Sequence, residues 1–91
     1  MKYVLFYESA EGVAENAPVH APAHGEYWRA FRERRGDPLL IGPFGDPQSQ
    51  GAMGVFSTRE AAEEFAAEDP FVVNGVVRSW EIWEWEESVE P

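Results

Sequence analysis

The chain has 91 residues, enough for one domain spanning residues 1–91 and too few for a second hydrophobic core. Seventeen Asp and Glu residues against seven Lys and Arg residues give a net charge of −10, so the molecule as a whole would repel phosphate backbones and anionic membranes. The absence of cysteine excludes disulfides, thiol nucleophiles and thiolate metal ligands. We therefore expect no nucleic-acid and no membrane partner.

The first half of the chain predicts a strand, a loop and a helix. Residues 2–8 are β-branched and aromatic, which favours a strand. This apolar run is too short for a secretory signal, so we expect a cytoplasmic protein. Residues 9–18 contain glycine, asparagine and proline and predict a loop. Bulky apolar residues at helical spacing then predict a helix from about Pro22 or Ala23 to Arg35, with Gly36 as its stop.

The second half predicts a hairpin, a helix and a last strand. Residues 39–44 and 52–57 favour strands around a turn. Ser57 and Glu60 fit a capping box for a helix from Thr58 to about Ala67. Asp69-Pro70 ends that helix, and an irregular link to Gly75 precedes a strand over about 76–86. The last residues, about 87–91, are expected to form a frayed tail.

The order βαββαβ predicts an α+β fold, with a four-stranded antiparallel sheet and two helices on one face. In such a fold the other sheet face meets water, and each strand should alternate apolar and polar residues. The first strand instead has apolar residues on both faces, with Leu5 on one face and Val4 and Phe6 on the other. The last strand likewise has Ile82 on one face and Trp83 on the other. A second copy covering this face would explain the pattern, so we expect a homodimer through the open sheet face. A bulge or an edge twist is the alternative.

Several short motifs in order resemble the YCII-related domain family. They are HGEYW at 24–28, Gly36, GPF at 42–44 and DPF at 69–71, and the resemblance covers nearly the whole chain. It implies a ferredoxin-like domain that pairs as a dimeric α/β barrel. It also implies a site built on a His and an Asp, carried here by His24 and Asp69. Departures from the family pattern, such as Gly25 and Gly54, leave the pocket's shape and substrate open.

The residues themselves allow two interpretations of this pair. At a predicted helix start, backbone amides disfavour a second proton on His24, and a neutral imidazole can act as a general base. Taken alone, His24 also fits an exposed histidine near an N-cap, and Asp69 fits an ordinary turn cap. Together they support the hypothesis that His24 is the acid/base and Asp69 its orienting partner.

Aromatic and turn residues near this pair are candidates for substrate contact. Phe44, Phe71 and Trp28 can wall an apolar pocket, and core or dimer interface is the alternative for each. Gly42 and Pro43 either shape the pocket or simply end a strand. The predicted substrate-binding residues are Tyr27, Trp28, Gly42, Pro43, Phe44 and Phe71.

We expect neither a cofactor nor a metal. The glycines follow no phosphate-loop or dinucleotide pattern. His20 and His24 are four residues apart, but Pro22 lies between them and no third ligand is near in sequence.

The first hypothesis for function is a small cofactor-independent enzyme that uses His24 and Asp69 for acid/base chemistry. Its substrate would be a small organic molecule, in line with the ring compounds and lactones that the resemblance implies, and isomerisation, lactone chemistry and elimination all fit. The alternative is a non-catalytic dimeric module that binds a small metabolite or a protein partner. A purely structural role is favoured if neither residue lies beside a cavity.

Overall fold

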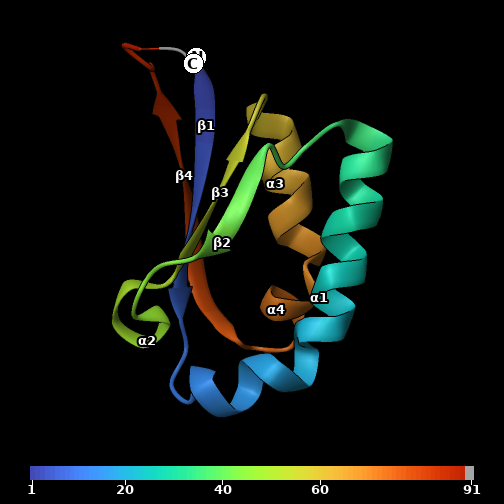
Figure 1. Ribbon diagram of the computed structural model, residues 1–91, viewed down its shortest axis with the longest axis vertical. Coiled ribbons are helices and arrows are strands. Elements are labelled where there is room, and N and C mark those ends of the chain that lie inside the picture. Colours follow the sequence, from blue (N-terminus) through green and yellow to red (C-terminus); the bar gives the residue numbers. More distant parts are fainter. Residues whose placement is uncertain (90–91) are drawn as a thin grey trace.

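The computed structural model describes residues 1–89 and contains one four-stranded antiparallel sheet with helices packed on it (Figure 1). The sheet order is β2-β3-β1-β4, so the first strand lies at the centre, between β3 and β4. The predicted α+β fold with ferredoxin-like βαββαβ order is therefore confirmed. The strands are β1 (Lys2–Ser9), β2 (Leu40–Pro43), β3 (Ala52–Phe56) and β4 (Val77–Trp85).

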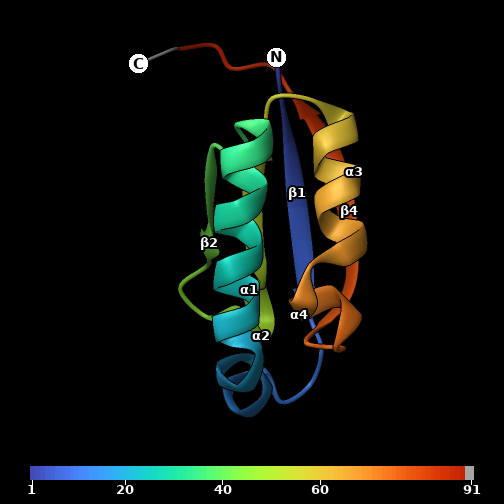
Figure 2. The same cartoon turned by 90° about the vertical axis from the view of Figure 1, so that its right-hand side faces the viewer.

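Two main helices lie side by side on one face of the sheet (Figure 2). They are α1 (Val13–Arg35) and α3 (Arg59–Glu68). Two single-turn helices, α2 (Pro47–Gln50) and α4 (Pro70–Val73), replace the predicted turn and irregular link. Within residues 1–89, no helix combines the length and the apolar character that crossing a membrane requires.

Helix α1 begins nine residues or more before the predicted start. Its N-cap is Gly12 in the left-handed region, and it continues through Pro18 and Pro22 to the predicted stop at Gly36. Each internal proline removes one backbone hydrogen bond, which is why the sequence favoured a loop here. The segment 13–23 also holds four alanines, the best helix formers, which offset part of that cost. Contact with α2 adds further support, since Val13 N donates to Gln48 Oε1 at 3.1 Å.

Helix α3 begins one residue later than the capping box predicted. Thr58, not Ser57, is its N-cap, and the Thr58 Oγ1 accepts from Ala61 N at 3.1 Å. Ser57 instead donates from its backbone N and its Oγ to the buried Asp37 carboxylate, at 3.1 and 2.7 Å. The competing partner for Ser57 lies 20 residues away, so local spacing does not reveal it.

The core between helices and sheet is filled by aromatic rings at one end. Phe31 of α1, Phe56 of β3 and Phe65 of α3 are all fully buried. The Phe65 ring centroid lies 5.3 Å from that of Phe31 and 5.2 Å from that of Phe56, within the usual range for aromatic pairs. We call this part of the molecule the filled end.

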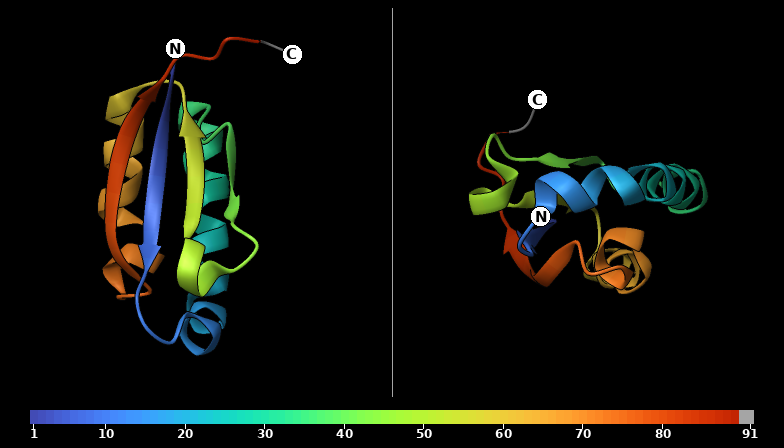
Figure 3. Two further views of the ribbon diagram at one scale, coloured as in Figure 1. Left: turned by 90° about the vertical axis from the view of Figure 1, so that its left-hand side faces the viewer. Right: turned by 90° about the horizontal axis from the view of Figure 1, so that it is seen from below.

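The sheet face turned away from α1 and α3 is covered by neither of these two main helices, and the single-turn α2 lies at one end of it (Figure 3). The strand register places Val4 opposite both Val55 and Trp83, and Phe6 opposite Met53, so these side chains share this face. Phe6 packs edge-on against Trp83 at 5.8 Å. The open sheet face is therefore apolar along its centre.

The predicted tail is partly tied to the start of the chain. Glu87 pairs with the N-terminal amino group at 3.1 Å and with Lys2 Nζ at 2.8 Å. The rest of the tail prediction includes residues 90–91, which lie outside the described residues.

Candidate functional site

His24 and Asp69 lie in direct contact although 45 residues separate them. His24 projects from the middle of α1, and Asp69 occupies the junction between α3 and α4. The His24 Nδ1 is 2.7 Å from the Asp69 Oδ1. Because α1 begins at Val13, His24 is far from the helix N-terminus, and the expected effect of the terminal amides on its ring does not apply. The Asp69 carboxylate is the group that acts on the ring instead.

Asp69 is fully buried and accepts hydrogen bonds on both carboxylate oxygens. Its Oδ1 accepts from Phe71 N at 3.0 Å as well as contacting His24. Its Oδ2 accepts from the Tyr7 hydroxyl at 2.7 Å. An ionised carboxylate can only accept hydrogen bonds, so the contact with an ionised Asp69 requires a proton on His24 Nδ1. In the neutral ring, Nε2 then carries the free lone pair.

Tyr7 is the member of this cluster that the sequence did not reveal. Burial raises the pKa of the Tyr7 phenol far above its ordinary value, and the charge of Asp69 raises it further. Tyr7 therefore remains a neutral donor to Asp69. The available signal was a tyrosine on the core side of a central strand, since a buried phenol requires a partner.

Phe71 fixes the plane of the histidine ring. The two rings are stacked with centroids 4.0 Å apart and 9° between their planes. Stacking on one side and the Asp69 bond at Nδ1 leave the ring little freedom to rotate. No group among residues 1–89 hydrogen-bonds Nε2, and His24 lines a cavity.

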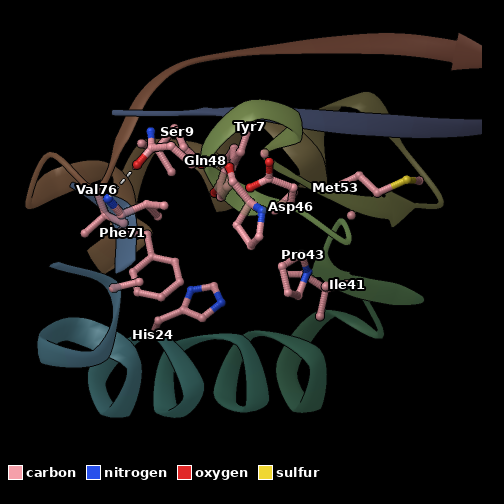
Figure 4. A pocket seen from close by; sticks show the side chains of 18 of the residues that line it. Tyr7, Ser9, His24, Ile41, Pro43, Asp46, Gln48, Met53, Phe71 and Val76 are labelled. Atoms are coloured by element: carbon pink, nitrogen blue, oxygen red, sulfur yellow. Dashed lines mark hydrogen bonds between the residues drawn. The ribbon is translucent and has the colours of Figure 1, made fainter. Parts of the chain in front are cut away.

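The cavity has a volume of about 470 Å³ and lies between α1, α2 and the sheet. Figure 4 shows the His24 and Phe71 rings on one side of it, with Pro43 and Asp46 across the gap. Its wall on α1 comes from Val13, Ala14, Ala17 and Pro18, and its floor from residues such as Leu5, Ala52 and Gly54. A volume of this size suits a small ligand with one or two rings.

The polar lining is sparse and largely occupied. Ser9 Oγ donates to the Pro47 carbonyl at 2.6 Å. Gln48 Nε2 donates to the Ala10 carbonyl at 3.0 Å, while its Oε1 accepts from Val13. These bonds hold α2 against residues 9–13. His24 Nε2 and Asp46 Oδ1 are the side-chain polar atoms of the lining that make no hydrogen bond within the described residues.

Three of the predicted substrate-binding residues line this cavity and three do not. Gly42, Pro43 and Phe71 belong to its lining. Tyr27 packs in the core 5.0 Å from Phe65 and donates to the Phe65 carbonyl at 2.9 Å. Trp28 lies beneath the Arg29 guanidinium, 4.7 Å from its ring centroid.

Phe44 stacks on Phe6, with ring centroids 6.4 Å apart, on the open sheet face. Strand β2 ends at Pro43, and the next residue, Phe44, places its ring on the sheet face opposite the cavity. In the described part of the chain, no three His, Cys, Asp or Glu side chains are grouped so as to hold a metal ion.

Comparison with known proteins identifies both a family and a fold. The model of the YCII-related domain matches residues 1–86. A similar solved structure is that of 5-chloro-2-hydroxyhydroquinone dehydrochlorinase from Burkholderia phenoliruptrix, in complex with 2,5-dihydroxybenzoquinone, with a TM-score of 0.75, 15% identity and coverage of 97% of this chain and 96% of that chain. A hypothetical Arabidopsis thaliana protein solved in solution is similar with a TM-score of 0.51, 13% identity and coverage of 99% and 89%. No curated protein matches the sequence significantly. Identities this low establish the shared fold alone.

Proposed function

Because the chain belongs to the YCII-related domain family, we propose that it is a cofactor-independent enzyme in which His24 transfers a proton on a small ring compound. The observation that carries the proposal is a single arrangement: a buried carboxylate holds His24 Nδ1 at 2.7 Å while Nε2 remains unbonded on a ligand-sized cavity. A ring nitrogen oriented in this way is the usual form of a histidine general base.

Each residue of the cluster has a separate part. His24 Nε2 takes a proton from the substrate, and the electron pair left behind forms a new double bond there. In isomerisation an existing double bond shifts and the imidazolium returns the proton to the carbon at its far end. In elimination the pair expels a leaving group such as chloride as an anion, and the imidazolium later gives its proton to water. Asp69 stabilises the imidazolium that results, and Tyr7 is a positioning residue that orients Asp69.

The structural neighbour suggests a first substrate to test. That protein is named as a dehydrochlorinase acting on a chlorinated hydroxyhydroquinone, and such an elimination needs a base for the departing proton. We expect this chain to release chloride from 5-chloro-2-hydroxyhydroquinone, with a loss of at least about a hundredfold in His24→Gln. Asp69→Asn should lower the rate as well, because it disturbs the tautomer of the ring. His20→Gln, one turn away on α1 and outside the cavity lining, is the matched control.

A titration of the His24 ring by NMR separates this proposal from its alternative. If the two residues act as a pair, the His24 titration moves when Asp69 becomes Asn, while that of His20 stays in place. Turnover that survives His24→Gln would contradict the proposal. Absence of turnover together with a His24 titration that ignores Asp69→Asn would favour the non-catalytic binding module.

The proposal includes a homodimer formed through the open sheet face. Leu40, Trp83 and Trp85 on this face are 69%, 59% and 49% exposed in the single chain, which is unusual for large apolar side chains that gather in one patch. A symmetric pairing of two such faces buries them on both copies. Trp83→Glu should therefore give a monomer in sedimentation equilibrium. Val19→Glu, at a position on α1 that is 70% exposed, should leave the mass of the assembly unchanged.

A further inference from the structure

The cavity is lined without a single positive side chain. None of the seven Lys and Arg residues of the chain is among its lining residues. Several are engaged elsewhere, since Arg34 and Arg35 pair with Glu64, and Lys2 pairs with Glu87. The one lining residue able to become cationic is His24, and its charge would be matched by Asp69. The lining therefore offers no counter-charge to an anionic ligand.

Asp46 adds a negative charge to the cavity wall. Its carboxylate accepts from Ser49 Oγ at 2.7 Å, and no cation among the described residues pairs with it. Asp46 is exposed, yet it belongs to the cavity lining and lies across the gap from His24 (Figure 4). A carboxylate on the ligand would lose water on entry and then face this charge.

The rest of the lining suits a flat apolar body. Most of it consists of aliphatic, proline and glycine residues, with the stacked His24 and Phe71 rings at one end. The polar side chains of Tyr7, Ser9 and Gln48 in the lining already make hydrogen bonds within the protein. A ring that enters this space covers apolar surface on both faces, and a hydroxyl at its edge can reach Nε2 of His24.

We infer that the cavity selects uncharged hydroxylated ring compounds over ring carboxylates, and that Asp46 supplies part of this selection. The inference rests on the proposed function, because it names the substrate class of the same cavity. Asp46 is in this sense a specificity-determining residue and takes no part in proton transfer.

The test compares two probes that differ in charge and are nearly equal in shape. Para-hydroxybenzamide and para-hydroxybenzoate are titrated separately into the full chain at neutral pH and low salt, and dissociation constants come from NMR shifts of the cavity residues. We expect the amide to bind at least about tenfold more tightly, because the carboxylate loses water on entry and then meets the negative charge of Asp46. Equal binding, tighter binding of the carboxylate, or failure of both probes to shift cavity residues would overturn the inference.

Two variants locate the source of the selection. Asp46→Asn should reduce the preference for the amide by about threefold, because this carboxylate is partly screened by water. Glu15→Gln changes the net charge by the same amount at an exposed position outside the lining, and should leave the preference unaltered. Equal effects of the two changes would mean that the net charge, and not Asp46, produces the selection.

His24→Gln separates this inference from the proposed function. The preference for the amide should persist in this variant, because it depends on the charge of the wall and not on proton transfer. If the amide binds selectively but no turnover depends on His24, the inference on selectivity holds and the proposal of an enzyme is contradicted. If turnover depends on His24 but the carboxylate binds more tightly, the proposal of an enzyme holds and the inference on selectivity is contradicted.

Discussion

The two ends of the helix–sheet layer are built from the same elements and filled in opposite ways. At the filled end, α1 and β3 contribute Phe31 and Phe56, and the rings leave no space. Toward the other end, which we call the cavity end, the same two elements contribute Ala17 and Gly54, and a cavity of about 470 Å³ remains. Side-chain size along one helix and one strand therefore separates the part that stabilises the fold from the part that can receive a ligand.

The largest effect is expected from emptying the filled end. Phe65→Ala should lower the free energy of unfolding by about 3–5 kcal/mol, because it removes a fully buried ring and leaves a void. Urea denaturation measures the loss. Phe71→Ala at the cavity end is the matched control and should cost clearly less, since Phe71 is only partly buried and its neighbour is already a cavity. Equal losses would remove the contrast between the two ends.

The next effect concerns the polar cluster beside the cavity. Tyr7→Phe should cost about 1–3 kcal/mol, because the buried Asp69 carboxylate loses one of its donors. If Tyr7 positions Asp69, the variant also shifts the NMR titration of His24. Tyr27→Phe removes a hydroxyl that bonds only the backbone carbonyls of Glu64 and Phe65, so it should cost less and leave the His24 titration unchanged.

A smaller effect on stability is expected from filling the cavity end. Ala17→Leu should change the free energy of unfolding by only about 0.5 kcal/mol, since leucine is nearly as good a helix former as alanine and enters existing space. Binding of para-hydroxybenzamide should nevertheless weaken more than tenfold as the space closes. Ala30→Leu, on the exposed side of α1, should alter neither quantity. Unchanged binding in Ala17→Leu would show that the ring binds elsewhere.

The smallest effect lies beyond the filled end, at the clamp between Glu87 and the start of β1. Hydrogen bonds from Lys2, from the backbone of Glu87 itself and from the N-terminal amino group together lower the pKa of Glu87 from 4.5 to about 2. A lowered pKa means that the contribution to stability is present above pH 4.5 and is lost as the pH falls toward 2. The Tm difference between the parent and Glu87→Gln should therefore shrink across this window. A Tm difference that stays constant across this window would contradict a role of this clamp in stability.

The strands and the helix stops were predictable because their signals are local. Short apolar runs rich in β-branched and aromatic residues identified the four strands, and Gly36 and Asp69-Pro70 marked the ends of α1 and α3 as the structure has them. The start of α1 was missed because two prolines and a glycine are typical of a loop. Here the alanines between them, and the contact with Gln48, decide the outcome.

The candidate site was predictable only in its outline. His24 and Asp69, the pair that the family resemblance implied, are in contact, and their role in catalysis stays a prediction. Tyr7 lies 62 residues from Asp69 and has no motif of its own. Trp28 and Phe44 were expected to wall the pocket because they are large aromatic residues of the HGEYW and GPF motifs. In the structure Trp28 contacts Arg29, and Phe44 contacts Phe6 on the open sheet face. The face on which a side chain lies depends on strand register and on its position around the helix, and a short motif does not reveal either.

The prolines inside α1 bear on the order in which the molecule forms. Pro18 and Pro22 each interrupt the chain of backbone hydrogen bonds, so the segment 13–22 cannot propagate as a helix from its own nucleus. Its bonds to Gln48 and the packing of Ala17 exist only once β1 and the hairpin β2–β3 are in place. We expect the segment 13–22, which forms the α1 wall of the cavity, to assemble after the transition state for folding. The φ-value should be near zero for Ala17 and well above zero for Phe31. The cavity would then be the last part of the molecule to take shape and the first to open.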